Sequence, residues 1–506
     1  MKKVAEKQAE TSPKLIPRPP VAVVMGHIDH GKTTLLDAIR KTSVASAEAG
    51  GITQAIGAYQ TEYHGKKITF IDTPGHEAFS SMRARGAHVA DIAILVVAAD
   101  EGVKPQTEEA IRIMREGELP LVVVINKIDK ANADPNRVKK ELAEREVLVE
   151  GFGGTVPVVN ISAKSGQGLE NLLETILLLA ELEELKTDPA RPGEGVVIES
   201  HIDPKRGATA TLLIEDGTVE RGDFIVIGNE IAPVRIFENF QGQAIDRATA
   251  SQPIRITGFS RPPGLGELFS VFRSRDEAEA HRGAREVRRE MPPAIAPGEE
   301  AKTVVNIILK TDVLGSKEAV EAAIRAIASP QLANRIVKSD VGDITESDVK
   351  LAAATANAII VGFRVKMPPV IRELALRSGV NVVLEEVIYE LIDKVKAAML
   401  AAAPAELKRL DLGRTKILAL FKADRSKQIV GGRVETGKIK IGARFDLIRN
   451  NVKIGSGKVL QLQSNRRDAE EVGEGQEFGI LTDADTTIAA GDGLEIFTEE
   501  KVIPQL

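Results

Sequence analysis

The sequence predicts a multidomain protein that combines α/β regions with regions rich in β-strands. Its 506 residues suffice for about three to five domains of ordinary size. Strand-like apolar runs alternate with helical patterns over residues 20–185 and again over 303–383, which is typical of parallel sheets covered by helices. Short strands with glycine turns over residues 195–273, and short strands again after Pro404, favour β-barrels.

A phosphate-binding pattern, G-x-x-x-x-G-K-[ST], occurs at residues 26–33, which read GHIDHGKT. The apolar run 21–25 precedes it as a buried strand, and residues 34–39 follow as the start of a helix. In that frame, backbone N–H groups of the loop can surround a nucleotide phosphate. We expect Lys32 to reach the β- and γ-phosphates and the Thr33 hydroxyl to ligate Mg²⁺. An ordinary glycine-rich turn is the alternative interpretation.

Two further segments extend the predicted site toward the γ-phosphate. Residues 72–75 read DTPG and follow a predicted strand, so Asp72 suits a contact with Mg²⁺ through water. Gly75 has no side chain, and its N–H can therefore approach the γ-phosphate closely. In the segment GGITQ, residues 50–54, a glycine pair beside Thr53 suits a loop that orders when the threonine reaches Mg²⁺. The alternative is an ordinary surface loop.

Two segments that each follow a predicted strand are expected to select the nucleotide base. They are NKID at residues 126–129 and SAK at residues 162–164. The Asp129 carboxylate can accept two N–H bonds from guanine, whereas adenine lacks that edge. A backbone N–H of the SAK segment can meet guanine O6. Each segment alone could be a polar turn, but their order indicates a GTP-binding domain with its site at the carboxyl ends of the strands.

Composition excludes some classes of protein. The chain has no cysteine, which rules out disulfides and thiolate metal sites and fits a reducing cytosol. Its N-terminus lacks the apolar core of a signal peptide, and no uncharged apolar run approaches the length that crosses a membrane. We therefore expect a cytoplasmic monomer without a membrane partner.

Together these motifs resemble bacterial-type translation initiation factor 2. The resemblance runs from about residue 19 to the C-terminus and is strongest in the first domain. The residues that carry it are 24–37, 50–58, DTPGHEAF at 72–79, AADEGVKPQT at 98–107, and 126–130.

The resemblance implies an order of domains along the chain. A flexible leader is expected first, and the last domain is expected to bind initiator tRNA. The expected parts are the leader (1–18), a P-loop GTPase domain (19–187), a translation-factor β-barrel (194–290), an α/β three-layer domain (300–384), a connector helix (385–404) and a C-terminal β-barrel (405–506).

Roles for individual residues follow from the same resemblance. His76 is expected to position the attacking water, and Gly75 to sense the γ-phosphate. Ile28 and Ile52 are expected to form an apolar gate that holds His76 back until the ribosome orders it. The expected Mg²⁺ contacts are Thr33, Thr53 and, through water, Asp72; the expected nucleotide-binding residues are Asp29, His30, Gly31, Lys32, Thr33, Thr34, Gly75, Asn126, Lys127, Asp129, Ser162, Ala163 and Lys164.

The implied activity is hydrolysis of GTP to GDP and phosphate, stimulated by the ribosome and dependent on Mg²⁺. Such a protein promotes placement of initiator tRNA on the small ribosomal subunit and the joining of the large subunit. Its partners would be both subunits, ribosomal RNA and initiator tRNA in its formylmethionyl form. The alternative is a ribosome-binding factor that uses GTP as a conformational clamp and does not recognise formylated tRNA.

The C-terminal barrel departs from the family pattern. The family typically has cysteines where this chain has Gly432 and the central residue of Glu477-Phe478-Gly479. The family's basic-aromatic run falls on QSNR at residues 463–466. The expected tRNA contacts are Arg433, Arg466, Arg467, Glu477, Phe478 and Gly479.

Charge is divided sharply along the same barrel. Residues 408–467 hold sixteen Lys or Arg against four Asp or Glu, a net charge of +12. Residues 468–506 hold one Lys against eleven Asp or Glu, a net charge of −10. A basic patch of this density favours contact with phosphates. The alternative is a solvated barrel face whose charge is offset by the acidic end.

Overall fold

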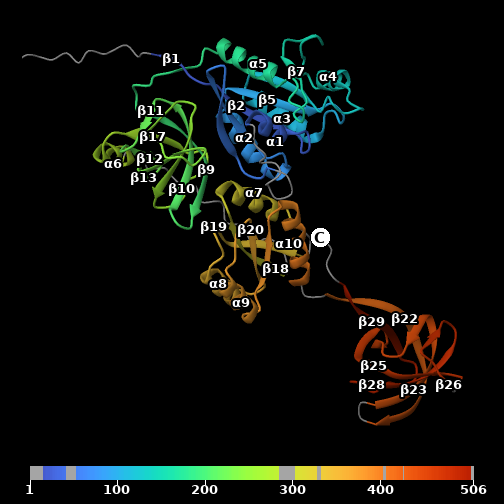
Figure 1. Cartoon of the computed structure of the whole chain (residues 1–506). Coiled ribbons are helices and arrows are strands. Elements are labelled where there is room, and N and C mark those ends of the chain that lie inside the picture. Colours follow the sequence, from blue (N-terminus) through green and yellow to red (C-terminus); the bar gives the residue numbers. More distant parts are fainter. Residues whose placement is uncertain are drawn as a thin grey trace, which may run out of the picture. The chain divides into compact units, whose positions relative to one another are not determined.

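The structure, a computed structural model, describes residues 15–40, 53–283, 303–327, 332–402, 406–424, 427–465 and 467–502. Its contacts divide the chain into two compact units, Met1–Met399 and Leu400–Leu506, which are treated separately below. Figure 1 shows three regions in the first unit, coloured blue, green and yellow-orange, and one in the second, coloured red. Within the described ranges, no helix is both long enough and apolar enough to cross a membrane.

The first region is built on a mainly parallel sheet. Neighbouring strands pair in parallel except for β3, which is antiparallel to β4. The buried parallel strands are nearly all apolar, as expected for strands covered on both faces. β3 is absent from the predicted strands because its polar residues break the apolar run. In sheet order the strands are β3 (Gly57–Tyr63), β4 (Lys66–Asp72), β2 (Val21–Gly26), β5 (Ile92–Ala98), β6 (Leu121–Asn126) and β7 (Val158–Asn160).

Helices cover both faces of this sheet. One face packs against α1 (Lys32–Arg40) and α5 (Leu169–Leu182), whose buried leucines share a core with alternate strand residues. The other face meets α2 (Ser80–His88) and α3 (Pro105–Glu116), which also contact each other. The remaining helices are the short η2 (Glu77–Phe79) and α4 (Pro135–Ala143), which the Asp134 side chain caps at its N-terminus. Because the strands are parallel, the loops that carry the predicted motifs leave the same edge of the sheet.

The second region is an antiparallel β-structure that wraps around one apolar core. Its main sheet has the order β13-β12-β17-β9-β10-β16-β14, and β11 pairs with β15. Before it, β1 (Ile16–Pro17) pairs with β8 (Lys186–Thr187) and joins the two ends of the first region. The elements are β9 (Glu194–Asp203), β10 (Gly207–Asp216), β11 (Thr218–Glu220), β12 (Phe224–Ile227), β13 (Glu230–Pro233), β14 (Ile236–Asn239), β15 (Arg247–Thr249), β16 (Pro253–Phe259), β17 (Leu268–Phe272) and α6 (Arg275–Gly283).

The third region is a second parallel α/β fold. Its strands have the order β19-β18-β20-β21, with α7 packed on β18 and β19, and α8 and α9 packed together against the strands β20 and β21. The predicted connector helix corresponds to α10, which begins three residues later than expected, at Ile388. The elements are β18 (Thr303–Thr311), α7 (Leu314–Arg325), β19 (Leu332–Val341), α8 (Glu346–Ala354), β20 (Ala358–Phe363), α9 (Pro369–Arg377), β21 (Asn381–Glu385) and α10 (Ile388–Ala402).

The second unit is a closed antiparallel barrel. Around the barrel the strands follow the order β22-β29-β24-β25-β28-β23, and β23 pairs back to β22. Phe445, Phe478 and Ile496 are among the residues that fill its core. The strands are β22 (Glu406–Asp424), β23 (Lys427–Lys440), β24 (Arg444–Arg449), β25 (Val452–Ser464), β26 (Arg467–Asp468), β27 (Glu471–Gly473), β28 (Glu477–Ala484) and β29 (Gly493–Val502).

Gly432 and Phe478 form a packed pair inside this barrel. They lie directly opposite each other on β23 and β28. A Cβ on Gly432 would lie 2.7 Å from the Phe478 ring and 2.5 Å from the Lys416 carbonyl oxygen. The ring therefore occupies the space that a side chain at position 432 would need.

We predict that Gly432→Ala destabilises the barrel by about 1–3 kcal/mol, because the added methyl meets backbone and ring atoms that cannot both move aside. Gly479→Ala is the matched control on the neighbouring strand, since a Cβ there meets no atom within 4 Å. Hydrogen exchange of β23 and β28 peptides in increasing urea measures both changes. Equal stability of the two variants would contradict the packing described.

Candidate nucleotide-binding site

The phosphate-binding loop joins β2 to α1, and both of its glycines are required by geometry. Gly26 has φ +147°, and a Cβ there would lie 2.3 Å from the Val96 carbonyl oxygen. Gly31 has φ +86°, and a Cβ there would lie 2.4 Å from Asn126 Nδ2. The loop borders a cavity of about 200 Å³ lined by Ile28, Asp29, Gly31, Lys32, Thr33, Thr34, Thr53, Gly75, His76 and Lys127. The structure thus gathers residues from four predicted motifs around one cavity.

Lys32 lies buried at the start of α1. Its Nζ donates hydrogen bonds to the Gly26 and His27 carbonyl oxygens, at 2.9 and 2.8 Å. Burial lowers the pKa of Lys32 to about 8. A Cβ on Gly75 would lie 2.6 Å from this Nζ, so the absence of a side chain at Gly75 is what allows the two loops to meet.

Three oxygen-bearing side chains meet beside Lys32. The hydroxyls of Thr33 and Thr53 are 2.9 Å apart, and Thr53 Oγ1 donates to Asp72 Oδ2 at 3.3 Å. They come from α1, from the segment before β3 and from the end of β4, so the fold brings together residues that the sequence separates. Mg²⁺ prefers oxygen ligands, and this donor set fits that ion.

Asn126 connects the phosphate loop to the base-reading segments. Its Nδ2 donates to the His30 carbonyl oxygen at 2.9 Å, and its Oδ1 accepts from the Ala163 N–H at 3.0 Å. The side chain is almost fully buried, at 2% exposure. Through this one amide, the ends of β2, β6 and β7 are tied to one another.

Asp129 is exposed, and one of its two carboxylate oxygens accepts a hydrogen bond from a neighbouring segment. Ser162 Oγ donates to Asp129 Oδ1 at 2.7 Å, and this bond holds the pKa of Asp129 below its usual range. Lys164, from the same segment as Ser162, is exposed, and neither Asp129 nor Lys164 lines the cavity. Lys127, with φ +62°, lines the cavity and pairs with Glu101 at 3.0 Å. A negative charge fixed in this way suits the N–H groups of guanine.

His76 also lines the cavity and is the N-cap residue of η2. Its Nδ1 accepts the Ala78 N–H at 3.2 Å, which leaves Nε2 for other partners. Burial lowers the pKa of His76, so the imidazole is neutral at physiological pH. A neutral ring can orient a water by hydrogen bonding.

The loop that carries His76 is held by two residues absent from the predicted site, Arg83 and Glu109. Arg83 is 1% exposed, and its Nη1 donates to the Pro74 and His76 carbonyl oxygens at 2.9 and 2.6 Å. Its Nη2 lies 2.8 and 2.7 Å from the two Glu109 oxygens. In the sequence, Arg83 sits in an RAR stretch that reads as solvated surface, so no local signal marks it.

His30 and Ile28 both belong to the phosphate-binding loop, but only Ile28 lines the cavity. The His30 ring is fully buried, with Nδ1 3.4 Å from the Val96 carbonyl oxygen, and it does not line the cavity; burial lowers its pKa to about 4. The buried ring packs against β5 below the phosphate-binding loop, next to the Val96 carbonyl. Ile28 does line the cavity, and its N–H donates to Gln106 Oε1 at 2.9 Å. Its proposed gate partner Ile52 lies outside the described residues, so the gate remains a prediction.

The predicted tRNA contacts gather on one part of the C-terminal barrel. Arg433 faces Glu477 across β23 and β28, and the hairpin bearing Arg467 is tied to the same strand because Ser464 Oγ donates to the Glu477 carbonyl oxygen at 3.2 Å. Phe478 is 4% exposed, so its ring belongs to the core and does not offer a binding surface. Arg466 lies outside the described residues.

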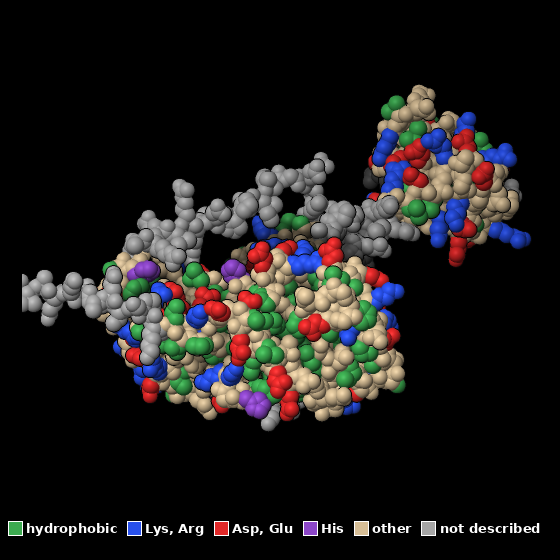
Figure 2. Space-filling view, turned by 90° about the horizontal axis from the view of Figure 1, so that it is seen from above, with side chains coloured by type: hydrophobic (Ala, Val, Ile, Leu, Met, Phe, Trp, Pro, Cys, Tyr) green, Lys and Arg blue, Asp and Glu red, His purple; other side chains and the backbone are tan. Residues whose placement is uncertain are grey.

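Basic and acidic side chains are interleaved on this barrel. β29, from the acidic end of the sequence, lies between the basic strands β22 and β24. Figure 2 shows blue and red side chains mixed on the visible face of this unit. Ion pairs that join the basic segment to the acidic end include Arg409–Glu495, Arg414–Glu495, Lys438–Glu471, Arg444–Glu499 and Arg449–Asp492. The charge separation along the sequence is therefore largely cancelled in space, as the alternative interpretation expects.

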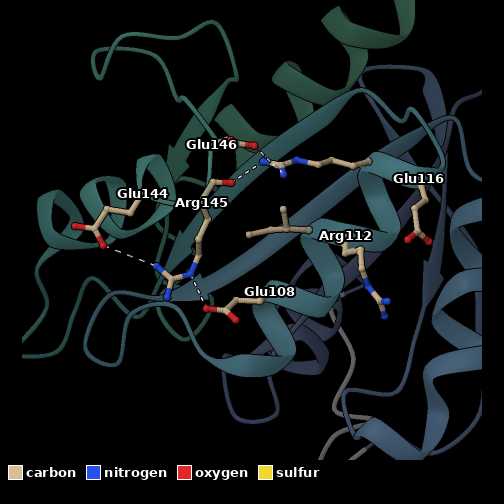
Figure 3. Close-up of a pocket in the computed structure, with 8 residues that line it drawn as sticks. Glu108, Arg112, Glu116, Glu144, Arg145 and Glu146 are labelled. Carbon is tan, nitrogen blue, oxygen red and sulfur yellow. Dashed lines mark hydrogen bonds and ion pairs between the residues drawn. The ribbon is translucent and has the colours of Figure 1, made fainter.

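A larger hollow, of about 640 Å³, lies elsewhere on the first region, between α3 and residues 144–146 (Figure 3). Two of its arginines pair with glutamates: Arg145 lies 2.7 Å from Glu108, and Arg115 lies 3.3 Å from Glu146. Exposed pairs of this kind contribute little energy. None of the predicted motif residues lines it, so the smaller cavity is the candidate site.

Three family models match successive parts of the chain. Residues 20–181 match the Elongation factor Tu GTP binding domain, and residues 192–272 match Elongation factor G domain 2. Residues 278–396 match Translation-initiation factor 2.

Two curated relatives that span nearly the whole of this chain are both named Translation initiation factor IF-2. The chain is 43% identical to Translation initiation factor IF-2 of Carboxydothermus hydrogenoformans, over 98% of this chain and 61% of that protein. It is 42% identical to the protein of the same name from Rubrobacter xylanophilus, over 96% and 72%. Among solved structures, GDP-bound aIF5B from Aeropyrum pernix is 29% identical, over 95% and 92%, with a TM-score of 0.44. The chain spans about three-fifths or less of the length of the first curated relatives that it matches.

The burial of Lys32 predicts that GTP affinity depends on pH. Phosphate binds the protonated ammonium, so affinity is full below the pKa of about 8 and falls by up to about tenfold per pH unit above it. Calorimetric titration with GTP from about pH 7 to about pH 9.5 measures this fall. Lys32→Arg is the control, because a guanidinium stays protonated throughout. The same decline in that variant would contradict the assignment to Lys32.

Proposed function

Because the chain belongs to the translation initiation factor 2 family, we propose that it is a ribosome-stimulated GTPase of translation initiation. In this proposal it hydrolyses GTP to GDP and phosphate, helps place initiator tRNA on the small ribosomal subunit and promotes joining of the large subunit. It acts in the cytoplasm as a monomer, in contact with ribosomal RNA.

One observation carries the enzymatic part of this proposal. Lys32, Thr33, Thr53 and His76 line a single cavity at the carboxyl edge of a parallel sheet, and the Thr53 hydroxyl contacts Asp72. Phosphoryl transfer to water needs little covalent chemistry from a protein and depends on positioning and charge stabilisation. This arrangement supplies both.

Each residue has a separate task in the proposed reaction. Thr33 and Thr53 would hold Mg²⁺ directly and Asp72 through water, and the ion would neutralise charge on the β- and γ-phosphates. Lys32 would exchange its two loop carbonyls for phosphate oxygens. The Gly75 N–H would meet the γ-phosphate. His76 Nε2 would orient the attacking water, because Nδ1 already accepts a hydrogen bond.

Guanine selection would depend on Asp129. An exposed, ionised carboxylate held by Ser162 can accept the N1 and N2 protons of guanine. With adenine that charge would face no donor, and an unmatched polar group costs far more than a matched one gains. Asn126 would hold the NKID and SAK segments at a fixed distance from the phosphate-binding loop. Lys127 would cover the base.

We predict that His76→Ala retains GTP affinity but loses ribosome-stimulated hydrolysis by about 10² -fold or more, because the water is no longer oriented. Single-turnover hydrolysis with and without ribosomes measures the loss. His64→Ala, at an exposed turn of the same region, is the control. Retained stimulation in His76→Ala would remove His76 from its proposed role.

We also predict tighter binding of formylmethionyl initiator tRNA than of its unformylated form. Arg433→Ala/Arg467→Ala is expected to lower the slope of log K against log salt by about 1.4, at about 0.7 for each lost contact with single-stranded phosphate. Filter binding at several salt concentrations tests both points, with exposed Arg235→Ala in the other β-region as control. Equal affinity for the two tRNA forms would favour the alternative function, a ribosome-binding factor that uses GTP as a conformational clamp and does not recognise formylated tRNA.

A further inference from the structure

The start of α10 contacts both of the loops that flank the proposed γ-phosphate position. Gln54, next to Thr53, is 1% exposed. Its Nε2 donates to the Glu386 carbonyl oxygen at 2.9 Å, and its Oε1 accepts the Ile388 N–H at 3.2 Å. One buried amide thus pairs with the backbone on both sides of Val387. Breaking this pairing would leave several polar groups buried without partners.

The second contact joins His76 to the same turn of helix. The rings of His76 and Tyr389 have centroids 6.5 Å apart and planes inclined by only 20°, an offset stack. Both residues border a cavity of about 650 Å³ between the η2 loop and the helices α7 and α10, whose other lining residues include Ala78, Ala322, Ala326, Ile327, Ile388 and Ile392. His76 borders the nucleotide cavity as well. His76 therefore lies between the nucleotide cavity and the cavity beside α10.

We propose that the start of α10 restrains GTP hydrolysis, with Tyr389 as a positioning residue that holds the His76 ring on the α10 side. Gln54 fixes the helix start to the loop of Thr53, so that both elements of the GTPase site are held by one element of the α/β region. Displacement of this turn of α10 frees His76 to orient water. The inference rests on the proposed function and adds a specific restraint to it.

The geometry explains why the restraint acts on turnover and leaves nucleotide affinity unchanged. Neither Tyr389 nor Gln54 lines the nucleotide cavity. His76 Nδ1 is engaged by the Ala78 N–H, so the direction of Nε2 follows the orientation of the ring. A stack that favours one orientation lowers the fraction of molecules ready to react. An aromatic pair of this kind changes such a population by about 2- to 10-fold.

The test is ribosome-independent hydrolysis by the full chain. Tyr389→Ala is expected to raise the single-turnover rate about 2- to 10-fold with GTP affinity unchanged. Tyr389→Phe, which keeps the ring, is expected to match the wild type. Tyr389→Leu serves as a second variant that keeps bulk and loses the stack, and it should behave as Tyr389→Ala does. In the double variant His76→Ala/Tyr389→Ala the increase should disappear.

Ile392→Ala is the matched control, since it opens the same cavity from the same helix without removing a ring. An unchanged rate in both Tyr389→Ala and Tyr389→Leu overturns the proposal. So does an equal increase in Ile392→Ala, or an increase that persists without His76. The wild-type response to ribosomes is measured in parallel: if ribosomes do not stimulate the wild type, it is the proposed function that fails.

Discussion

The nucleotide site depends on one buried amide, that of Asn126. Its two polar atoms hold the His30 carbonyl and the Ala163 N–H, so three loops that leave separate strands share one fixed spacing. The contact is so close that position 31 must be glycine, since any Cβ would collide with Asn126 Nδ2. In a dry environment each of these groups is costly to leave unpaired, which makes the arrangement rigid. Phosphate binding and base selection are thereby coupled in space.

The γ-phosphate side is organised by charge. Arg83 is almost completely buried, and a buried guanidinium is tolerated only because Glu109 and two backbone carbonyls satisfy it. Its target is the backbone of the Pro74–His76 loop, so Arg83 fixes the main chain from which the His76 side chain extends. The base-reading half of the site is thus held by the Asn126 amide, and the γ-phosphate half by the Arg83 guanidinium.

Much of this site follows from sequence, because motifs that come after parallel strands must meet at one edge of the sheet. Lys32, Thr33, Asp72 and Gly75 lie together for that reason, and Thr53 joins them from the segment before β3. The missing parts share a physical cause: Gln54 meets Glu386, and Arg83 meets Glu109, through contacts that no local pattern encodes. Likewise, the basic and acidic halves of the last barrel are separate in sequence, but antiparallel pairing of β29 brings them together.

The packing of Phe478 on Gly432 has a consequence for how this barrel can change over time. A side chain at position 432 has no room while the ring is present, and a smaller residue at position 478 would leave a void while the glycine is present. A larger residue at position 432 therefore requires a smaller residue at position 478. Each single substitution in either direction would give a less stable protein, so residues at these two positions are expected to change together.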